Sequence, residues 1–137
     1  MFESITNLKA SIQSEVLGEW VFDKKSKGTI EDPIRMPYIH YSDAIYDLIQ
    51  AIYAFSDEHP EYALKEYQSI LNESGLSWKR DSMRKADVST ADGQLVMALL
   101  MAAIRAERFC DGILLGLCED GTIVKWLSRL TEIDAGK

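Results

Sequence analysis

The feature that most constrains the fold is the run at positions 95–104, which contains no charged or strongly polar side chain. A helix that is apolar on all sides must be buried on all sides. Ala98, Ala102 and Ala103 in this run, and Ala106 after it, allow other helices to approach closely. The run is too short to span a bilayer, which requires about 20 apolar residues. We therefore expect a central helix that begins at a cap on Ser89 or Thr90 and continues to about residue 109.

Shorter helices with one apolar face are expected around this central helix. Ser4 is a candidate cap for the first, which would end near Gly18, and Ser42 for the second. Pro60 suits the first position of a third helix, and Gly75 suits its end. The apolar faces follow helical spacing and comprise Ile5, Leu8, Ile12 and Val16 in the first helix, Ile45, Leu48, Ile49, Ile52 and Phe55 in the second, and Ala63, Leu64, Tyr67, Ile70 and Leu71 in the third.

After the central helix, Gly112 predicts a break, followed by a short helix over residues 113–118. Thr122 is expected to start the last helix. The buried face of that helix comprises Ile123, Trp126, Leu127 and Leu130.

Two segments do not follow helical periodicity. Residues 19–37 are expected to form an extended arm or a small β-hairpin, with strands at 19–23 and 29–31 around a loop at 24–28. Trp20 and Phe22 would share one face of the first strand, and we expect this face to dock on the helices. Residues 76–89 are expected to form an irregular loop.

These patterns predict an all-α fold apart from the arm. We expect residues 1–137 to form a single domain of five or six short helices around the central one. The length suits one domain, and 47% hydrophobic with 27% charged residues is usual for a soluble globular protein.

Composition excludes several classes of function. A formal net charge of −7 repels nucleic-acid phosphates and anionic membranes, and the N-terminus lacks the pattern of a signal peptide. Cys110 and Cys118 are too few for a disulfide framework, so we expect a reduced, cytoplasmic protein with both thiols in the core. Neither they nor His40 and His59 match a zinc-site spacing, and there is no phosphate-binding loop or nucleophile elbow. We expect no catalytic residues, no cofactor and no metal.

Residues 105–112 form the first candidate site, because two cations and two carboxylates follow the apolar run at close spacing. On a helix, Glu107 and Asp111 lie one turn apart, and Arg108 is close enough to pair with Asp111. Paired carboxylates can perform acid–base chemistry, and Arg105 can bind an anion. The alternative, which we favour, is a buried ion-pair cluster at the end of the central helix.

Two further segments are weaker candidates. Residues 36–43 place Tyr38, His40 and Tyr41 before a helix, where they would either line a ligand site or pack on the core. Residues 78–85 combine one tryptophan with four cations. That grouping can bind single-stranded nucleic acid, but in an acidic chain it more often forms a solvated loop. This segment contains Trp78, Lys79, Arg80, Arg84 and Lys85.

Several strings spread over most of the chain resemble a family of bacteria and their phages, domain of unknown function 6508. The most specific is RAERFCDG at 105–112, and the others are GEWV at 18–21, GTIEDPIRMPY at 28–38, YSD at 41–43, ADVS at 86–89 and EDGTIVKWL at 119–127. The resemblance implies a small, mainly helical cytosolic protein. It implies no activity and no catalytic residues.

Three functional hypotheses follow. The first is a non-catalytic interaction module that binds a protein partner next to the arm and residues 76–89, or forms a homodimer through Trp20 and Phe22. The alternative is a small-molecule binder or hydrolase for an anionic ligand. Its site would contain Arg105, Glu107, Arg108 and Asp111, together with His40 or Tyr41. The third is weak nucleic-acid contact through residues 78–85.

Overall fold

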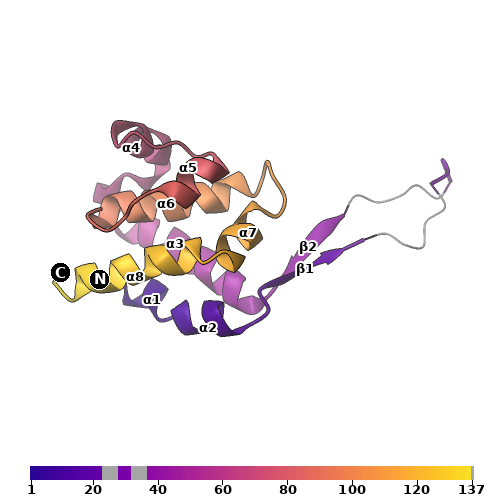
Figure 1. Cartoon of the computed structure of the whole chain (residues 1–137), viewed down its shortest axis with the longest axis horizontal. Coiled ribbons are helices and arrows are strands. Elements are labelled where there is room, and N and C mark those ends of the chain that lie inside the picture. The colour runs from indigo at the N-terminus through magenta and orange to yellow at the C-terminus, as the bar shows by residue number, and fades with distance from the viewer. Residues whose placement is uncertain (23–27, 32–36, 137) are drawn as a thin grey trace.

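A computed structural model describes residues 1–22, 28–31 and 37–136. It confirms the mainly helical fold with a small two-stranded sheet near the N-terminus. Helix α6 (Gly93–Ala106) lies among α3 (Asp43–Glu58), α4 (Tyr67–Glu73), α7 (Ile113–Glu119) and α8 (Thr122–Asp134), and contacts each of them. Figure 1 shows these helices as one body, from which strands β1 (Gly18–Val21) and β2 (Tyr38–Tyr41) project.

The prediction of a fully buried central helix is confirmed. Every residue of α6 from Val96 to Ile104 is buried. The helix begins later than predicted, because its cap is Asp92 and not Ser89 or Thr90. The Asp92 carboxylate accepts a hydrogen bond from the Leu95 N–H at 2.9 Å. That bond satisfies one of the backbone donors left free at a helix start.

There are more helices than predicted, because the first and third expected helices are divided. The first consists of α1 (Glu3–Thr6) and α2 (Lys9–Ser14). Ser4 lies inside α1 and caps nothing, and Val16 is exposed beyond α2. The third consists of two 3₁₀ turns, η1 (Pro60–Tyr62) and η2 (Leu64–Glu66), followed by α4.

Ala63 divides the third helix because its φ of 52° lies in the left-handed region. A right-handed helix cannot continue through that conformation. The predicted stop at Gly75 is confirmed, since its φ is 75° and the Leu76 N–H donates to the Leu71 carbonyl at 2.8 Å. Ser42 precedes α3 as predicted, although its hydroxyl makes no capping hydrogen bond.

The predicted hairpin has the wrong second strand. β1 pairs in antiparallel register with β2, so that Trp20 lies opposite Ile39 and Glu19 opposite His40. Residues 28–31 form bends instead of a strand. The predicted loop at 24–28 lies outside the described residues except for Gly28. Residues 38–41 contain two tyrosines and one isoleucine, and aromatic and β-branched residues favour strands, but the sequence pattern had been interpreted as the entry to a helix.

Residues 76–89 are not the irregular loop that was predicted, because they contain α5 (Arg80–Lys85). The Ser82 hydroxyl accepts a hydrogen bond from the Ser77 N–H at 2.9 Å, which closes the turn before the helix. Met83 is fully buried, so α5 is fixed by packing on the helical body. The predicted helices α7 and α8 are confirmed, with Ile123, Trp126, Leu127 and Leu130 buried in α8.

The N-terminal segment closes one end of the body. The Phe2 N–H donates to the Asp134 carboxylate at 2.9 Å, and the Phe2 ring stacks on Phe55 with ring centroids 5.2 Å apart. A Cβ atom on Gly93 would lie 2.6 Å from the buried tip of the Phe2 ring. The first residue of α6 is therefore glycine because Phe2 occupies the space of a side chain.

Gly93→Ala is expected to lower the free energy of unfolding by about 1–3 kcal/mol through overpacking. Helix propensity alone would change stability in the opposite direction, by up to about 1 kcal/mol. Urea unfolding followed by circular dichroism measures the difference. In a Phe2→Ala background the cost should disappear, and stabilisation by Gly93→Ala alone would contradict the packing of Phe2 on α6.

Candidate functional site

The structure does not bring the predicted site residues of segment 105–112 together. Arg105 lies in the last turn of α6 and lines a pocket with residues of α3 and η2. Arg108 and Asp111 follow the end of the helix and are exposed. No ion pair joins any of these residues to another part of the described chain. The predicted buried ion-pair cluster is therefore not formed.

Glu107 makes hydrogen bonds to backbone groups. Its carboxylate accepts from the N–H of Gly112 at 3.0 Å and from the N–H of Leu114 at 3.0 Å. These donors belong to the start of α7, where N–H groups have no partner within the helix. Glu107 thus closes the turn between α6 and α7, and a negative charge is favourable at that helix start.

Tyr41 is the one predicted site residue that lies beside Glu107. It is the last residue of β2, and its hydroxyl is buried without a hydrogen bond of standard geometry to the described residues. Burial raises the pKa of Tyr41 well above its ordinary value, and the nearby Glu107 carboxylate raises it further. Tyr41 therefore stays neutral at physiological pH, which suits a structural role between β2, α6 and α7.

His40 points away from this group. It lies opposite Glu19 in the β1–β2 register, and both side chains are exposed. Successive residues of a strand face opposite sides, so Tyr41 and His40 cannot both contribute to one site on the same face. The combined site of Arg105, Glu107, Arg108 and Asp111 with His40 or Tyr41 is not present as a common cavity among the described pockets.

The sheet carries large apolar side chains that are open to solvent. Trp20 is 42% exposed, Phe22 is 56% exposed, and their rings stack with centroids 6.3 Å apart. On the other face of the sheet, the neighbouring pair of Val21 and Tyr38 is also exposed, and the Tyr38 side chain is 55% exposed. We call these exposed side chains on both faces of the sheet, Trp20, Val21, Phe22 and Tyr38, the arm surface.

The expectation that Trp20 and Phe22 dock on helices is only partly met. The Trp20 ring lies over Gly112, where an added Cβ would be 2.7 Å from the ring, so its contact is with the α6–α7 turn. The same turn carries Phe109, which is 82% exposed. Phe109 was not among the predicted site residues, although its place within the charged string 105–112 separates it from the apolar run.

Part of the basic segment 78–85 makes contacts within the protein. The guanidinium of Arg84 forms an ion pair with Asp120 at 2.8 Å, and the guanidinium of Arg80 lies over Gly116 of α7. Lys125 of α8 donates to the carbonyls of Arg84 and Ala86, both at 3.1 Å. These contacts direct two of the four cations toward the protein body and away from a nucleic-acid ligand.

The two cysteines have different environments. Cys118 is buried in α7 as predicted, and burial raises its pKa to about 12, with the charges of Asp120 and Glu119 adding to the shift. Cys110 is exposed, so the expectation of a core position was wrong for this residue. It lies in the turn between α6 and α7, beyond the last buried turn of the central helix.

Two further properties of the described residues concern the requirements of a membrane-spanning helix and of a metal site. None of the described helices is long and apolar enough to cross a membrane. Within residues 1–22, 28–31 and 37–136, no three His, Cys, Asp or Glu side chains are grouped so that they could hold a metal ion.

Residues 13–135 match a family of unknown function, DUF6508. No curated protein and no solved structure matches the chain. The family match covers the sheet, the α6–α7 turn and the pocket next to Arg105, but it assigns a role to none of them.

Glu107→Ala is expected to lower the free energy of unfolding by about 1–3 kcal/mol, because two backbone donors lose a charged acceptor. Glu107→Gln keeps one acceptor oxygen and should cost less. Arg108→Ala is the matched control, and its exposed side chain predicts a change within about 0.5 kcal/mol. Chemical denaturation of the three variants tests this, and a larger loss for Arg108→Ala than for Glu107→Ala would contradict it.

The difference between the thiols predicts selective modification. At pH 8 a thiol with a pKa near 12 is almost fully protonated and therefore unreactive, whereas Cys110 is open to solvent. Ellman's reagent should label Cys110 in the folded protein and Cys118 only in denaturant. Cys110→Ser should abolish the fast reaction, and fast labelling that persists in this variant would show that Cys118 is accessible.

Proposed function

Since the chain belongs to DUF6508, a family of unknown function, we propose its role from the structure: a non-catalytic interaction module that binds another protein through the arm surface. The observation that carries this proposal is that several large apolar side chains of the arm are exposed. They stand on a sheet that projects from the helical body (Figure 1). Soluble proteins seldom expose neighbouring large apolar side chains without a binding role. Aromatic residues also contribute most of the energy in many protein interfaces.

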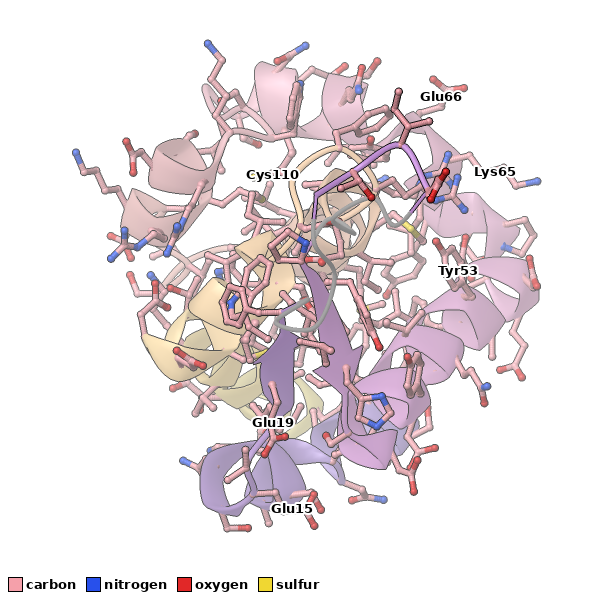
Figure 2. The ribbon with its side chains drawn as sticks, turned by 90° about the vertical axis from the view of Figure 1, so that its right-hand side faces the viewer. Glu15, Glu19, Tyr53, Lys65, Glu66 and Cys110 are labelled. Carbon is pink, nitrogen blue, oxygen red and sulfur yellow. The ribbon has the colours of Figure 1, made fainter. Side chains whose placement is uncertain are left out.

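The exposed apolar side chains of the arm suit an apolar groove in the partner, and the described carboxylates beside β1 suit a basic rim around that groove. Glu15 and Glu19 lie at the foot of β1, on the side of the molecule that faces the viewer in Figure 2. Both are exposed, and the chain as a whole carries a net charge of −7. Two copies of the chain would bring like charges together, whereas a basic rim would attract them. We therefore favour a different protein over a second copy as the partner.

The proposed surface excludes residues 76–89, which had been predicted to lie next to the partner. Met83 of α5 is buried, and Arg84 and Lys125 connect this segment to α7 and α8. The exposed Phe109 belongs to the same α6–α7 turn as Gly112, which contacts Trp20.

Replacement of arm aromatics should remove partner binding without unfolding the protein. We expect Trp20→Ala and Phe22→Ala each to weaken binding by more than about tenfold, since central aromatic residues contribute roughly 2 kcal/mol or more. Trp78→Ala is the matched control, because Trp78 is also 42% exposed but lies outside the arm. The partner is identified by a photo-crosslinking amino acid at position 22, is then purified, and is titrated with each variant.

Each outcome of this experiment has a definite meaning. A partner that crosslinks from position 22 but not from position 78, and that binds the Trp78→Ala variant normally, supports the proposal. Crosslinks between copies of this chain, with a dimer mass in light scattering, would establish the homodimer instead. Equal effects of the arm variants and the Trp78 control would overturn binding through the arm.

A further inference from the structure

A pocket of about 330 Å³ lies between α3, the η2–α4 segment and the end of α6. Its volume falls near the lower end of the range for small-molecule sites, roughly 300–1,000 Å³. Tyr53 of α3 and Lys65 of η2 face the same side of the molecule (Figure 2). This pocket is remote in sequence from the arm, and the inference drawn from it does not rest on the proposed function.

The inner surface of the pocket is apolar. Leu64 and Met101 are almost completely buried and form part of the lining, and Tyr53 and Tyr67 are half-buried beside them. Tyrosine rings present flat apolar faces, which pack well against another ring or a short hydrocarbon. The lining therefore suits the apolar part of a small organic molecule better than a hydrated inorganic ion.

The charged groups of the pocket are mainly cationic. Arg105 is half-buried and Lys65 is exposed, and neither forms an ion pair or a side-chain hydrogen bond with the described part of the chain. Asp57 is the one carboxylate in the lining. Two cations against one carboxylate give a local positive charge, in a chain whose net charge is −7. A guanidinium in this position can hold a carboxylate or phosphate with two parallel hydrogen bonds.

The backbone next to the pocket is strained. Ala63 is the one non-glycine residue with positive φ in the described chain, and it directly precedes Leu64 and Lys65. Its left-handed conformation is unfavourable for alanine and persists only where the surrounding structure fixes it. Ala63 also lines an adjoining hollow of about 200 Å³, which shares Ser56 and Asp57 with the pocket. The strained residue thus directs the two following side chains into the same lining.

We propose that this pocket binds a small organic anion, a ring-bearing molecule with one carboxylate or phosphate group. Arg105 holds the anionic group, and Lys65 adds positive charge at the rim. Tyr53 and Tyr67 pack against the ring, while Leu64 and Met101 exclude water beneath it. Asp57 accepts a hydrogen bond from a hydroxyl or amine on the ligand.

NMR titration of the full chain tests this proposal with four probes. Benzoate and phenyl phosphate carry a ring and an anionic group, whereas benzamide lacks the charge and inorganic phosphate lacks the ring. We expect saturable amide shifts at residues 53–57, 64–67 and 101–105 with one or both ring-bearing anions. Benzamide and inorganic phosphate should bind at least about tenfold more weakly, because each makes only part of the contacts. The stronger of the two anions identifies the anionic group that the pocket prefers.

Substitutions then distinguish binding in the pocket from binding to other cationic side chains on the surface. Arg105→Gln should weaken binding of the ring-bearing anions by at least about tenfold, and Lys65→Gln should weaken it less. Arg108→Gln is the matched control, since Arg108 is exposed outside the pocket, and it should leave binding unchanged. Phe22→Ala in the arm should also leave it unchanged. The proposal is overturned by equal losses for Arg105→Gln and Arg108→Gln, by equal binding of benzamide, or by no saturable binding of either anion up to about 10 mM.

Discussion

The burial of α6 on all sides is the constraint on which the rest of the structure depends. A helix without a polar face cannot lie at a surface, so α3, α4, α7 and α8 must surround it. Polar groups can then occur only near its ends. At the start, Asp92 satisfies a free N–H, and beyond its end Glu107 satisfies two N–H groups at the start of α7. The C-terminal end of α6 is next to the proposed pocket, which Arg105 lines, and the turn that follows it contacts Trp20 of the arm.

Helical geometry explains why the charged string 105–112 does not form one site. Successive residues of a helix differ by about 100° in direction, so neighbouring charges at its end are directed to different sides. Arg105 is directed into the pocket lined by α3 and η2, whereas Glu107 turns back onto the start of α7. Arg108 and Asp111 follow in the turn and are exposed. The same turn places Gly112 under Trp20, which connects the end of α6 to the position of the arm.

Sequence patterns predicted the helices that show a clear local periodicity. They failed to predict features that depend on contacts between segments far apart in the chain. The stripes of α3, α6 and α8 and the glycine signals at Gly75 and Gly112 were sufficient for those elements. The pairing of β1 with residues 38–41 was missed, because no local pattern identifies a strand's partner. The break at Ala63 was missed because alanine favours helices. Of the proposed pocket, the sequence singled out only Arg105, because of its charge. Tyr53, Tyr67 and Lys65 come from other elements, and no local pattern shows that these elements pack beside the end of α6.

A rigid helical body would favour both proposed interactions, protein binding by the arm surface and anion binding in the pocket, for the same physical reason. Binding is weakened when side chains and backbone must lose freedom, so groups that are already held in place lose less. The ring of Trp20 is held by Gly112 and by stacking on Phe22, and Glu107 fixes the turn beneath it. In the pocket, Arg105 extends from the last turn of a helix that packing immobilises on every side. The apolar run that leaves α6 without a polar face therefore also provides the fixed support from which an exposed sheet and a cationic pocket can act independently.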